Sequence, residues 1–159
     1  MRRTVIGCVT IGFSICLGYL GYVLSTQANE PAFAFTTSVE PKPIDVNMHD
    51  FMEGVFQAPY RRLKQIMATE PKDAATWKAL RSDALILAEG GNLILLRKPD
   101  KDLDAWQRYS VASRDAGGEL VMAAKKKDFQ GATVAYHAML SHCNACHKQF
   151  LDGKQQLAP

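Results

Sequence analysis

Residues 101–126, KDLDAWQRYSVASRDAGGELVMAAKK, carry apolar or small side chains at every third or fourth position. These positions are Leu103, Trp106, Tyr109, Ala112, Ala116, Leu120 and Ala123. A spacing of three and four places side chains on one face of an α-helix. No stretch of the chain alternates with a period of two for long enough to indicate a sheet. We therefore expect an all-α protein.

Three further segments repeat the helical pattern. They cover residues 44–68, 73–99 and 128–152. Pro59 predicts a kink near the middle of the first segment. Gly90-Gly91 leaves two interpretations open for the second: an early helix end, or a continuous helix packed closely at the glycines. Four segments of roughly 24 residues with short connections predict an up-down-up-down four-helix bundle over residues 44–159.

The middle of residues 101–126 is built from small side chains. They are Ala112, Ser113, Ala116, Gly117 and Gly118. Such a stretch lets a neighbouring helix approach closely, and it would also leave room for a flat ligand.

The overall composition is that of an ordinary globular protein. Of 159 residues, 47% are hydrophobic and 22% are charged, which excludes collagen-like, wholly disordered and disulfide-dense classes. The net charge of +3 includes Arg2 and Arg3 at the start of the chain. Without these two, 17 of the 19 basic residues remain against 16 acidic ones, a net of +1. Charge therefore gives no support to nucleic-acid binding.

The N-terminus carries a targeting pattern. Two arginines precede an apolar run over residues 5–24, long enough to span a hydrocarbon core of about 30 Å as a helix. We assign residues 1–26 to a signal peptide or signal-anchor helix, in which residues 4–24 would hold an uncleaved chain in the cytoplasmic membrane. Residues 27–43, with three prolines, are expected to be a flexible linker. The rest of the chain is then exported to the periplasm.

The chemistry of the chain is concentrated in Cys143-Asn144-Ala145-Cys146-His147. On a helix, positions i, i+3 and i+4 share one face, so both thiols and the imidazole would project together. Two thiols can then add to the two vinyl groups of one haem, and the adjacent imidazole can bind its iron. The motif therefore predicts one covalently attached haem c per chain.

Two other kinds of site, a structural zinc site and a redox-active dithiol, also use closely spaced cysteines. A structural zinc site normally needs four ligands, whereas this motif supplies three. His142 is the nearest further candidate, about 100° of helix rotation from Cys143. A thioredoxin-like dithiol needs a βαβ context, which the pattern lacks. A chance pentapeptide is the remaining alternative. Export, the bundle pattern and the motif together favour haem c.

An exported, all-helical chain with one Cys-x-x-Cys-His in its last helix resembles the class II cytochromes c, the cytochrome c′ group. The resemblance covers residues 44–152. It is specific at Cys143, Cys146, His147 and Phe150, and at the Phe51-Met52 step. It implies a four-helix bundle, a covalent haem packed near Phe150, His147 as the proximal iron ligand and often a homodimer.

The family divides at the sixth position of the iron. In one branch a methionine of the first helix completes the coordination and the protein carries electrons. In the other branch the site stays open and small gases such as nitric oxide can bind. Aligned with the family pattern, Met52 falls at the sixth position, with Met48 and His49 as rivals and an open site as a further alternative.

We therefore expect an electron carrier with His147 and Met52 as iron ligands, acting between exported redox proteins. A five-coordinate, gas-binding haem protein is the alternative. The chain is not expected to be an enzyme, because no further acid–base constellation is visible: His137 and His142 are interpreted as surface or helix-edge residues.

Overall fold

The structure is a computed structural model that describes residues 39–159. The expected signal or anchor helix and most of the expected linker lie outside these residues. The described residues form helices and loops, with no strand among them, so the all-α class is confirmed. No helix between residues 39 and 159 combines the length and apolar character needed to cross a membrane.

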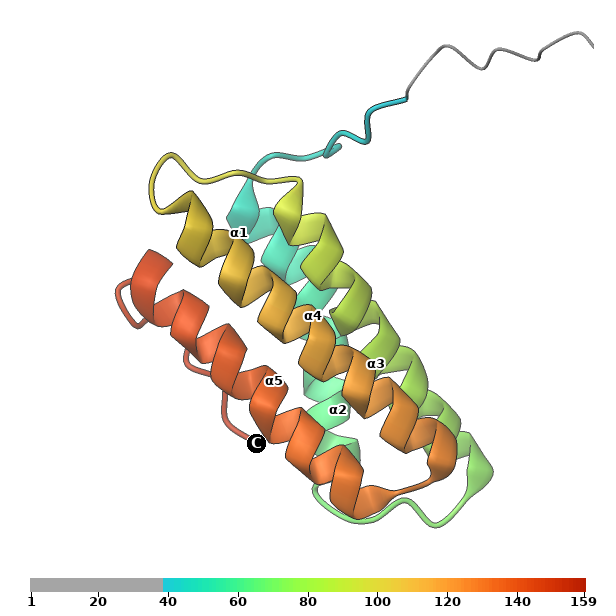
Figure 1. Cartoon of the computed structure of the whole chain (residues 1–159). Helices are drawn as coiled ribbons and strands as arrows, with labels where there is room; N and C mark the ends of the chain where they lie inside the picture. Colours follow the sequence, from blue (N-terminus) through green and yellow to red (C-terminus); the bar gives the residue numbers. More distant parts are fainter. Residues whose placement is uncertain (1–38) are drawn as a thin grey trace, which may run out of the picture. The chain divides into compact units, whose positions relative to one another are not determined.

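Four helical rods make up the described part of the chain (Figure 1). The first rod is continuous but has three parts, α1, the π-helical η1 and α2, and is called the first bundle helix below. The elements are α1 Met48–Phe51, η1 Met52–Gln57, α2 Ala58–Met67, α3 Ala74–Leu95, α4 Leu103–Lys126 and α5 Phe129–Phe150.

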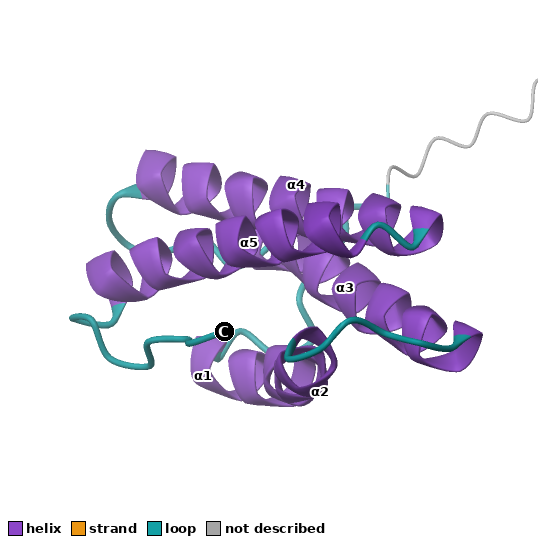
Figure 2. Cartoon of the chain, turned by 90° about the horizontal axis from the view of Figure 1, so that it is seen from below, coloured by secondary structure: helices purple, strands orange, loops and turns teal. Residues whose placement is uncertain are grey.

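Consecutive helices run antiparallel, so the predicted four-helix bundle is observed (Figures 1 and 2). Helix α4 packs along both α3 and α5, and the first bundle helix packs on α3. Because each connection is short, the start of the first bundle helix lies at the same end of the bundle as the end of α5. This arrangement brings residues near 50 and residues near 147 to one end of the molecule.

Aspartates begin two of the helices. The Asp73 carboxylate accepts a hydrogen bond from the Thr76 backbone N–H at 2.8 Å, and Asp128 accepts one from Gly131 at 2.9 Å. Such caps satisfy backbone donors that have no partner within the helix. The helices consequently begin within a few residues of the bounds that the sequence predicts.

Apolar side chains gather in two clusters. The larger one contains Leu63, Leu80, Leu120, Tyr136 and Met139, all at most 2% exposed, and so joins all four rods. The second apolar cluster is centred on Phe51, Ile94 and Trp106, with six partly buried side chains packed against it. Those six are Met48, Met52, Val55, Phe56, Cys146 and Phe150.

Near Pro59, where the sequence predicts a kink, the structure has a π-helical stretch, η1, that ends two residues before this proline. Proline lacks a backbone N–H, and its ring crowds the carbonyl four residues earlier, here that of Val55. A π-helical turn changes the register at such a point and redirects the side chains that it carries. Met52 is the first residue of this stretch.

The glycine pair does not end α3. The helix continues to Leu95, so the close-packing interpretation of Gly90-Gly91 is correct. A Cβ at Gly90 would collide with the Phe56 ring, and one at Gly91 would lie 3.0 Å from the Ser110 carbonyl oxygen of α4. In α4, Gly117 plays the same part against α3, because its Cβ would lie 3.0 Å from the Cα of Ala88.

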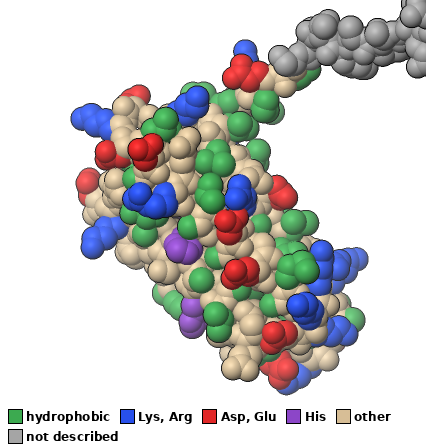
Figure 3. Space-filling view, viewed as in Figure 1, with side chains coloured by type: hydrophobic (Ala, Val, Ile, Leu, Met, Phe, Trp, Pro, Cys, Tyr) green, Lys and Arg blue, Asp and Glu red, His purple; other side chains and the backbone are tan. Residues whose placement is uncertain are grey.

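An ion pair between a buried carboxylate and a half-exposed guanidinium ties the first bundle helix to α3. The Asp83 side chain is only 6% exposed and accepts hydrogen bonds from Arg62 Nη2 at 2.6 Å and Nε at 2.9 Å. A buried carboxylate needs such a partner, since burial of an unpaired charge is costly. Elsewhere, charges of both signs are interspersed on the face shown in Figure 3.

Candidate functional site

The three motif residues Cys143, Cys146 and His147 lie in the last two turns of α5, and each side chain is partly buried. Their spacing on a regular α-helix gives them a common face. Both cysteines are free thiols. The helix therefore presents two thiols and one imidazole together, as the motif requires.

The two thiols lie in protected surroundings. Burial raises the pKa of the Cys143 thiol, while a hydrogen bond to the Ser113 hydroxyl, at 3.9 Å between sulfur and oxygen, acts in the opposite direction. Burial also raises the pKa of Cys146 to about 11, and the neighbouring Cys143 adds to this shift. Both side chains are therefore neutral thiols near pH 7, which are less prone than thiolates to oxidation or metal capture.

The imidazole of His147 is held by one hydrogen bond. Its Nδ1 lies 2.7 Å from the backbone carbonyl oxygen of Gln155. Because a carbonyl can only accept, Nδ1 carries a proton, and in the neutral imidazole this leaves the lone pair on Nε2. A metal-binding histidine is usually oriented in this way, with one nitrogen donating to a carbonyl and the other free for the metal. His147 thus fits the role of an axial ligand to haem iron.

The second apolar cluster surrounds the site at Cys146, whereas Cys143 packs against the larger cluster. The second apolar cluster brings Met52 and Met48 from the first bundle helix together with Cys146 and Phe150 from α5. The methionines and the α5 residues are about ninety residues apart in the sequence, and the antiparallel arrangement of the helices brings them together.

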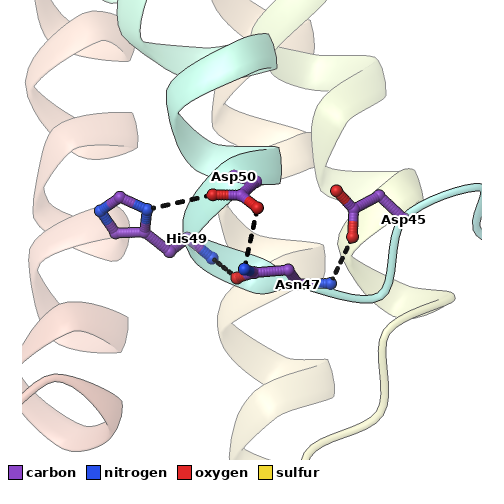
Figure 4. A network of polar contacts seen from close by, with 4 residues as sticks. All are labelled: Asp45, Asn47, His49 and Asp50. Atoms are coloured by element: carbon purple, nitrogen blue, oxygen red, sulfur yellow. Dashed lines mark hydrogen bonds and ion pairs between the residues drawn. The ribbon is translucent and has the colours of Figure 1, made fainter.

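His49 is placed differently from the two methionines. Its ring is 75% exposed, and its Nδ1 lies 3.4 Å from an Asp50 carboxylate oxygen (Figure 4). Asn47 caps the same turn, since its side-chain oxygen accepts from the His49 backbone N–H at 3.0 Å and its amide donates to Asp50 at 2.8 Å. This polar network fixes the start of the first bundle helix, and His49 belongs to it rather than to the second apolar cluster.

The two histidines outside the motif and the first bundle helix lie on α5. His137 is exposed and His142 partly buried. Among residues 39–159, no group of three or more histidine, cysteine, aspartate and glutamate side chains could hold a metal ion. An iron already bound by a porphyrin takes only one or two ligands from the protein, so this finding concerns protein-only sites such as zinc.

Sequence reasoning missed the residues beyond α5. The segment from Gln155 to Ala158 contacts His147, Asn144 and Tyr60 through five hydrogen bonds. Its residues show no hydrophobic period, and a short polar terminus is ordinarily expected to be loosely held. The only sequence signal was Leu157, an isolated apolar residue that packs against the larger cluster.

No protein-family model matches the chain, and no curated protein matches it at a significant level.

Proposed function

We propose that the protein is an exported c-type cytochrome that carries single electrons. Cys143 and Cys146 form the two thioether bonds to one haem, and His147 binds the iron through Nε2. When bound, the haem supplies an iron that alternates between the ferric and ferrous states. The chain holds the haem, fixes its axial ligand and surrounds it with apolar side chains.

The observation that carries this proposal is the hydrogen bond that orients the His147 imidazole. Its Nδ1 proton is committed to the Gln155 carbonyl at 2.7 Å, which leaves Nε2 available on a helix that also presents two free thiols. A zinc site would use a fourth ligand, and no suitable group of side chains is found among the described residues. A dithiol redox pair would need a thiol with a lowered pKa, whereas burial raises the pKa of both Cys143 and Cys146.

Met52 is the proposed sixth ligand. It packs in the second apolar cluster, which also contains Cys146, whereas the ring of the rival His49 is 75% exposed. Met48 packs in the same cluster and remains the competing ligand. If neither thioether binds, the apolar side chains around the open position favour the alternative function, binding of small uncharged gases.

For location, we propose that residues 1–26 direct export and that electron-transfer partners are exported redox proteins.

The test is covalent attachment of haem. The purified protein should keep its haem through denaturing electrophoresis and acid–acetone extraction, and its mass should include one haem. Cys143→Ser and Cys146→Ser should each weaken this retention, because one of two thioether bonds is lost. Lys148→Ala, an exposed change next to the motif, is the matched control and should retain haem fully. Haem that extracts completely from the unaltered protein would overturn the proposal.

A further inference from the structure

Beyond α5 the chain reverses direction and ends beside that helix (Figure 1). The reversal uses positive φ angles at Asp152 (51°), Gly153 (74°) and Gln155 (60°). Residues other than glycine adopt this conformation uncommonly, so surrounding contacts must hold it in place. Gln155 is also the residue whose carbonyl oxygen accepts the hydrogen bond from Nδ1 of His147.

Residues 155–158, called the C-terminal strap below, are fastened to two helices. On α5, the Asn144 side chain makes two hydrogen bonds to the backbone of Leu157. Its Oδ1 accepts from the Leu157 N–H at 2.7 Å, and the Asn144 Nδ2 donates to the Leu157 carbonyl oxygen at 2.9 Å. On α2, the Tyr60 hydroxyl donates to the Ala158 carbonyl at 2.8 Å and accepts from the Ala158 N–H at 3.1 Å.

These bonds act on the histidine through the backbone. Leu157 is two residues from Gln155, so fixing Leu157 restricts where the Gln155 carbonyl can point. Asn144 lies between the two cysteines of the motif, one turn before His147 on the same helix. Helix α5 therefore positions both the His147 imidazole and, through Asn144, the Gln155 carbonyl that accepts its hydrogen bond. Tyr60 of α2 is a second anchor for the strap.

We propose that the C-terminal strap holds and polarises the axial histidine, and that Asn144 and Tyr60 are positioning residues for it. The proposal rests on the function proposed above. A fixed carbonyl acceptor at Nδ1 strengthens donation from Nε2 to the iron, which stabilises the ferric state and lowers the reduction potential. Loss of the strap should accordingly raise the potential and free the imidazole to rotate.

The existence of the strap can be measured independently of the haem. In the full-length protein, the backbone amides of Leu157 and Ala158 should exchange with solvent more slowly than expected for a free terminus, because both donate hydrogen bonds. Asn144→Ala should speed exchange at Leu157, and Tyr60→Phe should speed it at Ala158. Free exchange of both amides in the unaltered protein would overturn the proposal while leaving covalent haem attachment untouched.

Its effect on the histidine is measured in the haem-loaded protein. Asn144→Ala, Tyr60→Phe and a chain ending after Lys154 should each shift the midpoint potential upward, with the truncation giving the largest shift. The His147 Nδ1 proton, followed by NMR, should exchange faster in the same order. Pro159→Ala and Lys148→Arg, which keeps the charge beside the motif, are the controls and should change neither quantity.

The outcomes separate this proposal from the function beneath it. An unaltered protein without covalent haem overturns the proposed function, and the link between strap and iron falls with it. Covalent haem together with an unchanged potential and unchanged Nδ1 exchange in the truncated chain overturns the strap alone. Because Asn144 lies inside the attachment motif, its alanine variant could fail to load haem, in which case Tyr60→Phe and the truncation decide.

Discussion

The ring of Phe150 meets the indole of Trp106 edge-on, with ring centroids 5.0 Å apart and an interplanar angle of 88°. Aromatic pairs favour this geometry. The Trp106 Nε1–H in turn donates to the Ile94 carbonyl oxygen at 3.2 Å. One indole therefore joins the end of α3, the start of α4 and the end of α5, at the end of the bundle that carries Cys143, Cys146 and His147.

The first prediction concerns this indole. Trp106 is 6% exposed, so Trp106→Ala should destabilise the fold by about 3–5 kcal/mol, through lost burial and the cavity that remains. Denaturant unfolding measures the loss. Val134→Ala on α5 is the control: Val134 is 66% exposed, and the change should stay within about 0.5 kcal/mol. Equal losses in the two variants would show that the indole does not hold the helix ends together.

Two adjacent glycines of α4 should respond oppositely to alanine. A Cβ at Gly118 meets nothing within 4 Å, so Gly118→Ala should stabilise the protein by about 0.5–1 kcal/mol through helix propensity. A Cβ at Gly117 would lie 3.0 Å from backbone and side-chain atoms of Ala88, so Gly117→Ala should destabilise by about 1–3 kcal/mol. Thermal unfolding of both variants tests the contrast. A gain in stability at Gly117 would mean that α3 and α4 are not in such close contact.

Alkaline pH should weaken the fold through Tyr136. Its side chain is buried, and its hydroxyl has no hydrogen-bond partner among the described residues. Burial, with a smaller contribution from Tyr60, raises its pKa from 10.0 to about 12. Between these values the unfolded chain releases a proton that the folded chain retains, so stability is full below pH 10 and falls as pH rises towards 12.

The matched variant is Tyr136→Phe, which removes the titrating hydroxyl. Its unfolding free energy should decline less steeply than that of the unaltered protein over this pH interval. Near neutral pH the variant should be at least as stable, because no hydrogen bond within the described structure is lost. Parallel pH profiles for the two proteins would exclude Tyr136 as the source of the alkaline loss.

Local signals predicted the helices well because their determinants lie near one another in sequence. Asp73 and Asp128 cap helices that begin directly after them, and periodic apolar residues mark the buried faces. Periodicity alone could not decide Gly90-Gly91, since the deciding contacts are with Phe56 and with α4. The buried face of α5 includes Ala135 and Tyr136, whereas their apolar neighbour Val134 is exposed.

The candidate site could be predicted only in part, because some of its contacts join residues that are distant in the sequence. The motif residues are contiguous, so their common face follows from helix geometry. The acceptor of the His147 proton is a backbone carbonyl eight residues further on, and backbone atoms carry no sequence signal. The link between Tyr60 and Ala158 spans 98 residues and likewise depends on the assembled bundle.

The last prediction concerns the ligand opposite His147. Met52 is partly buried in the second apolar cluster, at the start of the π-helical stretch, and its unbranched thioether can adapt to an iron in that cluster. If it binds, the ferric protein is low-spin and shows the weak long-wavelength band of sulfur–iron ligation. Met52→Ala should abolish the band, give a high-spin site and admit carbon monoxide to the ferrous iron. Stability should also fall by about 2 kcal/mol, the low end for such truncations, because the side chain is only partly buried.

Two neighbours provide the controls for Met52. Met48→Ala removes a thioether from the same cluster one turn earlier and should leave the low-spin state intact. His49→Ala should do likewise, since its ring is 75% exposed and pairs with Asp50. Loss of the low-spin state in the Met48 or His49 variant, with its retention in the Met52 variant, would transfer the sixth position to that neighbour. A high-spin unaltered protein that binds carbon monoxide readily would instead favour gas binding over electron transfer, because the iron would then already have an open face.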